Sequence, residues 1–498
     1  MDSLARQATI DKGCWPVAPG KGMQERRLFM NDAAVPRKNG SPILWASVIL
    51  FGLFGIQTAY QMYHANRIQL DVNADLSAEL ADAVLLDEEP APASAGWPQW
   101  RGPHRDGVVH ADNLLTDWPD DGPPLLWSKT VGLGYSSFAV RDGRLYSLFS
   151  EGDKEVVACW RVESGEEVWR YTFDCKYTPK DYPGPRSTPT LDGDRLYVVG
   201  SAGQFLCLNI TTHALCWQKD LLADFHADAP RWGVAFSPLI DGDLVFTSPG
   251  GRKGNSLAAF NKITGELVWK ALNDPPGYSS PLAVTIADTR QIIFFTGDSL
   301  VGVTASGGKL CWRFPWKTSF DVNAATPVAF QARKGDQILH YIFISSGYGK
   351  GCALLKIAPT KADGFEAKAV YQGNQMSSHF ASPVRRGDYL FGIDDSRFAC
   401  LNLRTGKTKW TQAGINKGSL LRVDDHLIVL GEQGKLFLFD ASAEKRGPRA
   451  EARPFRNRCW TMPVLAEGRL FLRDERQIKC FDLRTNPDQA EGGQSRGR

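Results

Sequence analysis

The chain has 498 residues, of which 43% are hydrophobic and 23% are charged, proportions typical of a folded protein with a buried core. Its formal net charge of +3 is nearly balanced, and no run of Lys and Arg indicates a stripe that follows a phosphate backbone. Composition therefore excludes a largely disordered chain and predicts no nucleic-acid partner.

The N-terminal residues predict a membrane anchor. Residues 1–41 are irregular, with Gly, Pro and scattered charge, and we expect them to be disordered. Pro42–Tyr60 (PILWASVILFGLFGIQTAY) carries no charge, and at ~1.5 Å per residue a helix of this length spans a hydrocarbon core of about 30 Å. We therefore expect a transmembrane signal-anchor helix over residues 42–63.

The charges on either side of the apolar stretch predict its orientation. Basic residues precede it and acidic residues follow it, so the positive-inside rule places the N-terminus in the cytoplasm and the rest in the periplasm, outside a bacterial inner membrane. A cleaved signal peptide is the alternative, with Ala59 and Ala65 as weak cleavage-site support, although the region before the apolar core is long for one. A lipid anchor is disfavoured because no Cys follows the stretch until Cys159.

Composition also predicts the boundaries of the folded domain. Residues 64–95 are acidic, rich in Ala and Pro and free of Phe, Trp and Tyr, which is typical of a linker. Order is expected to return at Trp97, in the stretch WPQWRGPHRDGVV. We expect one folded domain over residues 96–486 and a disordered tail over residues 487–498.

The stretch from Arg186 to Leu221 (RSTPTLDGDRLYVVGSAGQFLCLNITTHALCWQKDL) contains the unit that recurs along the rest of the chain. A Ser-Thr-Pro-Thr leader is followed by a DGD turn, an alternating strand, an SAG turn, a further strand and a last strand that contains Trp217. Four antiparallel strands in about 40 residues, repeated, are typical of a β-propeller blade.

Alignment of the leaders and of the closing aromatic residues gives eight units. After Arg186–Leu221 is counted, the others are Tyr135–Phe173, Trp232–Ala271, Tyr278–Trp316, Asn323–Gly373, His379–Gly414, Gly418–Phe455 and Cys459–Leu483. The last unit lacks a fourth strand, whereas Leu125–Val131 (LLWSKTV) is a strand without a unit. We therefore predict an all-β, eight-bladed β-propeller of four-stranded antiparallel blades, closed by this N-terminal strand and preceded by one transmembrane helix.

Two residue types recur for reasons of packing. Cys207, Cys400 and Cys480 occupy one position of the repeat, and the ten Cys include no CxxC motif, so buried apolar filling is favoured over a disulfide or a metal site. The closing Trp of each unit lies near Thr-Gly turns and is expected to pack between blades.

The units follow the pattern x-S-P-x-x-x-D-G-x-L-Y-x-x-x-x-x-G-x-L-x-C-L-[ND]-x-x-T-G-x-x-x-W, which resembles the pyrroloquinoline-quinone (PQQ)-like propeller repeat. The resemblance covers about residues 97–483, and the repeat is shared by quinoprotein alcohol dehydrogenases and the outer-membrane-assembly lipoprotein BamB. It implies the fold but no activity, because the motif encodes blade packing.

The enzymatic branch of this family implies a vicinal Cys pair over the cofactor, calcium-binding Glu and Asn residues and a catalytic Asp. This sequence has no adjacent Cys pair, and Asp321, Asp394 and Asp395 fall in predicted turns, where Asp is common. Calcium ligands could still converge from distant blades. We expect no catalytic, cofactor-binding or metal-binding residues, with a PQQ-dependent oxidoreductase that uses calcium as the alternative.

The best candidates for a functional site are the residues just before each innermost strand, because these rim the central channel on one face. They are Tyr135, Arg186, Arg231, Trp232, Tyr278, Asn323, His379, Lys417 and Trp460. Aromatic side chains together with Arg and His suit an anionic or glycan-like small ligand, or a peptide. The alternative is that these side chains seal the channel and satisfy one another.

The expected function is a membrane-tethered periplasmic scaffold, in the mode of BamB, whose blade loops or edges recruit protein partners of the envelope. The analogy departs at the anchor, because BamB is a lipoprotein of the outer membrane, whereas this chain has an apolar span and no Cys placed for acylation. Outer-membrane assembly is therefore not implied as the role.

Overall fold

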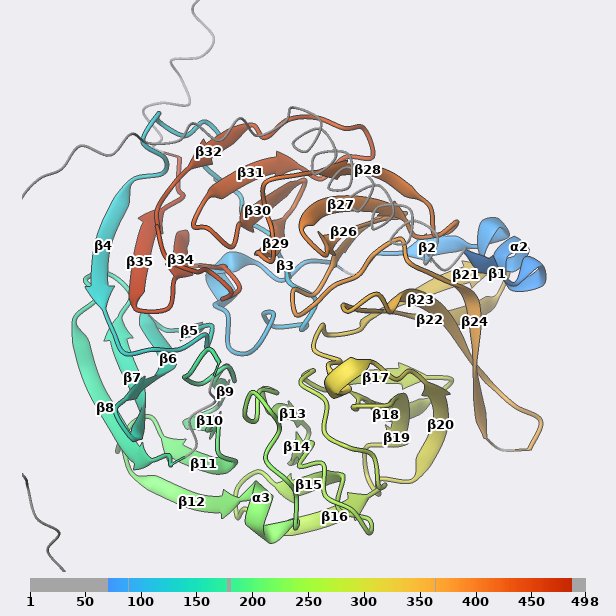
Figure 1. The fold of residues 1–498 in the computed structure, drawn as a ribbon, viewed down its shortest axis with the longest axis horizontal. Coiled ribbons are helices and arrows are strands. Elements are labelled where there is room, and N and C mark those ends of the chain that lie inside the picture. Colours follow the sequence, from blue (N-terminus) through green and yellow to red (C-terminus); the bar gives the residue numbers. More distant parts are fainter. Residues whose placement is uncertain (1–69, 88, 177–180, 363, 486–498) are drawn as a thin grey trace, which may run out of the picture. The chain divides into compact units, whose positions relative to one another are not determined.

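The computed structural model describes residues 70–87, 89–176, 181–362 and 364–485. Their strands form eight sheets of four to six strands, and the sheets follow one another around a common axis (Figure 1). Each sheet is one blade, and within a blade successive strands pair antiparallel. The predicted all-β, eight-bladed propeller of four-stranded blades is confirmed.

The blades are numbered one to eight in chain order, and each runs outward from the axis. The innermost strands are β5 (Ala139–Arg141), β9 (Thr190–Asp192), β13 (Leu239–Asp241), β17 (Leu282–Ile286), β21 (Val328–Lys334), β25 (Val384–Arg386), β29 (Ser419–Val423) and β33 (Val464–Ala466). The second strands are β6 (Arg144–Glu151), β10 (Arg195–Val199), β14 (Leu244–Thr247), β18 (Thr289–Phe295), β22 (Gln337–Ser346), β26 (Tyr389–Asp394), β30 (His426–Leu430) and β34 (Arg469–Arg473).

The outer half of each blade is made by its last two strands. The third strands are β7 (Lys154–Arg161), β11 (Gln204–Asn209), β15 (Leu257–Asn261), β19 (Ser299–Thr304), β23 (Gly351–Pro359), β27 (Arg397–Asn402), β31 (Leu436–Asp440) and β35 (Gln477–Asp482). The outermost strands are β8 (Glu167–Asp174), β12 (Leu215–Asp220), β16 (Leu267–Ala271), β20 (Leu310–Pro315), β24 (Phe365–Gly373), β28 (Thr408–Gln412), β32 (Ala450–Ala452) and, in blade eight, β4 (Leu125–Thr130).

The middle strands are apolar on both faces because each blade is packed between two others. In β7 and β11, every residue except the two at the strand ends is buried. The three repeat-position cysteines, Cys207, Cys400 and Cys480, are fully buried on third strands, which confirms their prediction as apolar filling.

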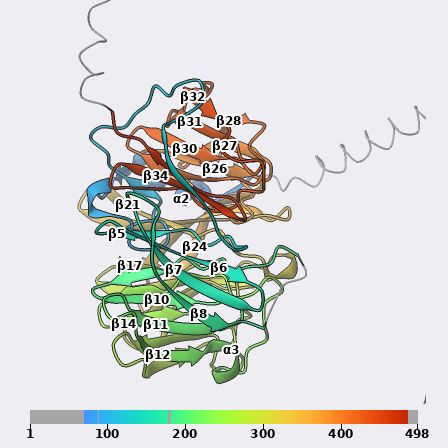
Figure 2. The same cartoon turned by 90° about the vertical axis from the view of Figure 1, so that its left-hand side faces the viewer.

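The ring is closed by the N-terminal strand, as predicted. Strand β4 pairs antiparallel with β35, with Trp127 opposite Cys480 (Figure 1, Figure 2). The Trp127 indole N–H also donates to the carbonyl oxygen of Val162 in blade one, at 2.9 Å. The closure joins the two ends of the propeller, so β35 is not left as an unpaired edge.

The closing Trp residues pack between blades, which confirms the prediction for them. Trp217 of blade two donates its indole N–H to the carbonyl oxygen of Lys262 in blade three, at 3.2 Å. A Cβ placed on Gly265 of the neighbouring Thr-Gly turn would lie 2.7 Å from the Trp217 ring, so this turn requires glycine. Trp269 makes the same contact with Ala305 of blade four, at 2.9 Å.

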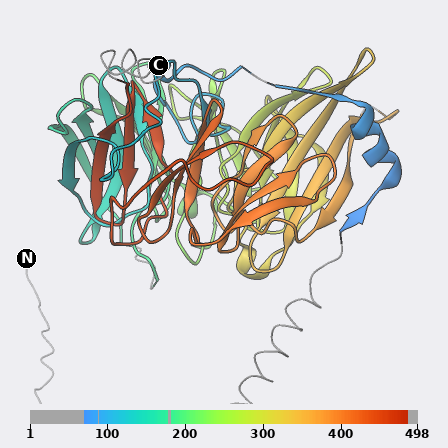
Figure 3. The same cartoon turned by 90° about the horizontal axis from the view of Figure 1, so that it is seen from above.

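The linker predicted over residues 64–95 is wrong for much of its length. Residues 70–87, here called the strap, form β1 (Asp71–Val72), α2 (Ala74–Asp82) and β2 (Val84–Leu86). Strand β1 pairs with the outer edge of blade five at β24, and β2 pairs with its inner edge at β21. Figure 3 shows α2, in blue, lying against this blade.

Buried contacts and ion pairs hold the strap in place. Leu80 is fully buried in the core between blades five and six. Glu79 pairs with Lys356 of β23 at 2.5 Å, and the Arg404 guanidinium donates to the carbonyl oxygens of Leu80 and Ala83 at 2.6 and 2.8 Å. The acidic residues that made this segment resemble a solvated linker are therefore partly paired with cations of distant strands.

The predictions for residues 1–41, for the span at 42–63 and for the tail at 487–498 lie outside the described residues. None of the helices in the described part of the chain has the length and apolar content needed to cross a bilayer.

Candidate functional site

Ser and Thr residues just before the innermost strands help to fix the positions of the rim residues. The backbone N–H of Thr188 donates to the Ser237 hydroxyl of the next blade at 2.9 Å, and the N–H of Ser237 donates to the Ser280 hydroxyl at 2.9 Å. The N–H of Thr326 donates to the Ser382 hydroxyl at 2.8 Å in the same way. These inter-blade bonds lie a few residues beyond the rim positions and hold the start of each innermost strand at the axis.

The rim encloses a cavity of about 270 Å³. Seven of the nine predicted rim residues line it: Tyr135, Arg186, Trp232, Tyr278, His379, Lys417 and Trp460. They come from seven blades, and their convergence follows from their common place before an innermost strand. Tyr182, Tyr348, Phe380 and Trp100 also line it and were not among the predicted residues.

One wall of the cavity is an aromatic cluster around Trp460. The Trp460 ring centroid lies 5.3 Å from that of Tyr135, 4.7 Å from that of Tyr182 and 5.2 Å from that of Phe380. Arg458 lies over the rings of Tyr182 and Trp460, at 4.4 and 4.8 Å from their centroids. Tilted and edge-to-face ring contacts, with the Arg458 guanidinium over two of the rings, hold this wall together.

Two carboxylates tie this wall to the blades behind it. The Trp460 indole N–H donates to Glu432 at 2.9 Å. The Tyr135 hydroxyl and the Arg458 guanidinium both donate to Glu475, at 2.9 and 2.8 Å. Burial, together with the charge of Glu475, raises the pKa of Tyr135 to about 12, so the phenol stays protonated.

The opposite wall is formed by Trp232, Tyr278 and Tyr348. The Trp232 and Tyr278 rings meet edge to face with centroids 5.7 Å apart. Arg231, which was a predicted rim residue, does not line the cavity but lies over the Trp232 ring at 5.0 Å and over Phe320 at 5.4 Å. Arg231 therefore supports the wall from outside.

The lining cations differ in how they are paired. Arg186 donates to the carbonyl oxygens of Tyr182 and Gly184, at 2.7 and 2.9 Å, and His379 lies 3.3 Å from Asp395. The half-buried Lys417 makes no ion pair or hydrogen bond with any residue in the described ranges. Lys417 is therefore the cation most open to a ligand.

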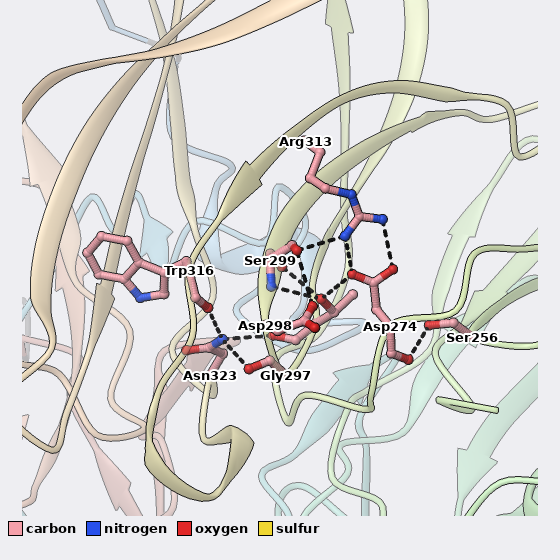
Figure 4. A network of polar contacts seen from close by, with 9 residues as sticks. Ser256, Asp274, Gly297, Asp298, Ser299, Arg313, Trp316 and Asn323 are labelled. Carbon is pink, nitrogen blue, oxygen red and sulfur yellow. Dashed lines mark hydrogen bonds and ion pairs between the residues drawn. The ribbon is translucent and has the colours of Figure 1, made fainter. Parts of the chain in front are cut away.

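The prediction for Asn323 as a rim ligand is wrong. Asn323 is fully buried, and its amide donates to the carbonyl oxygens of Thr296, Gly297 and Trp316 at 2.8, 3.3 and 3.0 Å (Figure 4). Its Oδ1 accepts a hydrogen bond from the Ser346 hydroxyl at 2.8 Å. All polar atoms of the amide are engaged by protein, so this residue fixes loops rather than contacting a ligand.

The loop that Asn323 holds is fixed on its other side by charge. The Arg313 guanidinium donates to both oxygens of Asp274, whose side chain is 1% exposed, as Figure 4 shows. Burial favours the protonated form of Asp274, but the bonds and charge of Arg313 outweigh it, so the pKa of this carboxyl is lowered. The pKa of Asp298 is raised by burial and by its neighbour Asp274.

The cavity has a floor that sequence reasoning missed. Residues 97–107, here called the axial plug, cross the axis beyond the rim. The carbonyl oxygen of Pro98 accepts the N–H of Leu191 in blade two at 2.8 Å, and that of Gly107 accepts the N–H of Arg422 in blade seven at 2.9 Å. Trp100 lines the cavity and donates its indole N–H to Thr326 of blade five at 2.9 Å.

Two buried arginines hold the plug to the innermost strands. Arg101 donates to the carbonyl oxygens of Ser382 and Pro383 at 3.1 and 2.8 Å, and Arg105 donates to that of Ser237 at 3.1 Å. Burial lowers the pKa of Arg101 to about 10 and that of Arg105 to about 9. The WRGPHRDG stretch was the available sequence signal, because two Arg beside Gly and Pro lie outside any repeat.

The residues present do not fit a calcium-loaded quinone in this cavity. No group of three or more His, Cys, Asp or Glu side chains within the described ranges could hold a metal ion. Among the described residues that line the cavity there is one carboxylate, Glu432, and no Cys. Glu432 already accepts a hydrogen bond from the Trp460 indole N–H. We therefore derive no reaction step that uses a quinone or calcium at this cavity.

Comparisons with known proteins agree with this architecture. The family model described as outer membrane protein assembly factor BamB matches residues 154–412. Comparison with curated proteins gives no match.

Among solved structures, quinohemoprotein alcohol dehydrogenase from Comamonas testosteroni is similar, with a TM-score of 0.59 and 13% identity, over 82% of this chain and 84% of that one. BamB from Moraxella catarrhalis has a TM-score of 0.50 and 13% identity, over 72% of this chain and 99% of that one. Identities this low show the shared fold alone. Because the family model matches more than half of the 498 residues, the chain belongs to the PQQ-type propeller family described as outer membrane protein assembly factor BamB.

Proposed function

We propose that this chain is a non-catalytic binding propeller that captures a protein partner at the axial cavity. The observation that carries the proposal is the convergence of seven side chains from seven blades on one aromatic cavity. Trp, Tyr and Arg are the residues that supply most of the energy at the centres of protein interfaces. Under this proposal, the axial cavity is the surface through which the scaffold expected from the sequence binds its partner.

The charged groups around the cavity favour binding over chemistry. Glu432 and Glu475 are held by the Trp460 indole and by Tyr135 and Arg458, and His379 lies beside Asp395. A general acid or base needs a group that can exchange its proton with a substrate. Glu432 and Glu475, which are fixed in this way, orient the aromatic wall around Trp460.

The proposed location is the periplasmic side of a bacterial inner membrane, with residues 42–63 as the anchor. It is supported by the uncharged stretch Pro42–Tyr60 and by the charge difference across it. Partners would then be proteins of the cell envelope. Alkaline extraction of membranes that contain the full chain should leave it in the pellet if the span is correct.

A photo-crosslinking residue at Trp232 in the full chain, expressed in its own host, tests the proposed function. The matched control is the same residue at Asp243, an exposed turn position at the opposite end of blade three. We expect a discrete protein adduct from position 232 and none from position 243. Equal adducts from both positions, or none from position 232, would contradict capture at the cavity.

A separate assay tests the quinone alternative. The purified full chain is incubated with PQQ and calcium, and dye reduction is measured with a range of alcohols. The donor set of the cavity predicts no PQQ-dependent reduction. Turnover that requires both additions would replace the binding proposal by an oxidoreductase.

A further inference from the structure

We propose that the axial cavity takes the C-terminal end of a partner polypeptide, with a bulky apolar last side chain between the aromatic walls and the terminal carboxylate on Lys417. The inference rests on the proposed function and adds the part of the partner that is recognised. Four features of the cavity carry it: its floor, its size, its unpaired cation and its walls.

The floor makes the cavity a dead end. The axial plug bonds to backbone atoms of four innermost strands or of the residues just before them, through Pro98, Arg101, Arg105 and Gly107. Trp100 closes the cavity itself and is held by Thr326. A polypeptide can therefore enter from the rim but cannot run through the ring, which favours a chain end.

The size of the cavity limits what it can enclose. Its volume of about 270 Å³ lies just below the ~300–1,000 Å³ typical of clefts that bury whole small ligands. A space of this size suits one or two terminal residues of a larger molecule. The rest of the partner would then lie over the rim.

The charge pattern favours a carboxylate. Lys417 lines the cavity and makes no ion pair or hydrogen bond with the residues that the structure describes, whereas Arg186 and His379 are engaged by neighbours. The Ser237 and Ser280 hydroxyls accept backbone N–H groups of neighbouring blades, which leaves each O–H able to donate to a ligand. The Lys417 ammonium is complementary to a carboxylate, and a charge-assisted bond of this kind is strong, whereas the hydroxyls of blades three and four would meet other polar atoms of the chain end.

The walls favour an apolar or aromatic last side chain. Trp460 and Phe380 stand on one side, and Trp232 and Tyr278 stand on the other. Arg458 already lies over the Trp460 ring, and Arg231 already lies over the Trp232 ring. A cationic side chain of the partner would therefore add little binding energy at these rings. A flat or branched apolar side chain remains the best filling.

The experiment uses fluorescently labelled pools of short random peptides that end in Phe, Trp or Leu, each made with a free carboxylate and as the amide. The pools are titrated against the purified full chain, and affinity is read from fluorescence polarisation. We expect the free acids to bind about tenfold or more tightly than the amides, as loss of a charge-assisted bond implies. Lys417→Gln should remove this difference, whereas Lys445→Gln, at an exposed position outside the cavity, should retain it.

The inference is overturned if acids and amides bind equally, if no acid pool binds, or if Lys417→Gln retains the difference. Tighter binding of sugar acids than of any peptide would assign the cavity to glycans instead. If position 232 still crosslinks a protein while the free acids fail, the chain-end inference is wrong and the proposed function stands. If position 232 crosslinks nothing, both fall.

Discussion

The side chains before the innermost strands show how far the sequence predicts the candidate site. Trp232 and Trp460 stand at equivalent positions of the repeat, so their convergence could be predicted from the spacing alone. Asn323 stands at the same position but is turned into the protein by three carbonyl oxygens of blade four and its connecting loop. Periodicity predicts where a residue lies along the axis, whereas its rotamer depends on neighbours that are distant in sequence.

Other lining residues could not have been found from the repeat. Tyr348 comes from the turn between β22 and β23, and Tyr182 from the long connection into blade two. Both positions lie in insertions that differ between the units. Whether the lining residues act in recognition remains a prediction.

A buried carboxyl gives a pH dependence at the residue scale. Glu155 is 1% exposed, and burial raises its pKa, while the bonds donated by the Ser201 N–H and hydroxyl act in the opposite direction. The folded protein therefore holds this proton more tightly than the unfolded chain does. The contribution of Glu155 to stability is full below its unfolded pKa of about 4.3 and is lost as pH rises through the raised value.

Glu155→Gln tests this dependence. Because Gln cannot ionise, the variant should gain stability relative to the wild type as pH increases from about 4 to 8. The free energy of unfolding in urea, measured for both proteins across this range, gives the difference directly. Glu163→Gln, the same substitution at an exposed position, is the control, and a stability difference for Glu155→Gln that does not change with pH would refute the account.

At the scale of elements, the blades were predictable and the strap and the axial plug, which precede the ring, were not. Each blade is built from local hairpins, so its strands are visible in one stretch of sequence, and in blades one to three an Asp-Gly turn separates the first two strands. The strap and the axial plug pair with strands hundreds of residues away, and their own sequences lack a strand period. Pairing with strands so distant in the sequence cannot be predicted from the sequence of the strap or of the plug alone.

The strap is expected to be an integral part of the fold. Leu80→Ala removes a fully buried side chain from the core between blades five and six, which should lower the free energy of unfolding by about 2–5 kcal/mol. Hydrogen exchange followed by mass spectrometry should show faster exchange in residues 70–87 of this variant. Ser77→Ala, at a half-exposed position of the same helix, is the control.

Unchanged exchange in the strap of Leu80→Ala would show that its two strand pairings suffice without the buried leucine. Complete unfolding of the protein would show instead that the strap is required for the ring.

At the scale of the whole molecule, the plug and the rim divide the axis into a closed end and an open end. Trp100 lines the closed end, and the aromatic walls surround the open one. This asymmetry distinguishes one face of the propeller, the face at which we propose recognition. The described chain also begins on this side, since the Leu70 side chain lies near Gly373, where β24 leads toward His379.

The central claim is that the open end captures a protein partner. The most direct test is quantitative mass spectrometry of proteins crosslinked to the full chain in native membranes, comparing the wild type with the Arg186→Ala/Trp232→Ala double variant. Lys407→Ala, which removes a positive charge from an exposed turn of blade six at the opposite end, is the control. The account predicts that the double variant keeps its melting temperature and loses its partner about tenfold or more, while the control retains it. Full partner recovery with the double variant would contradict the account.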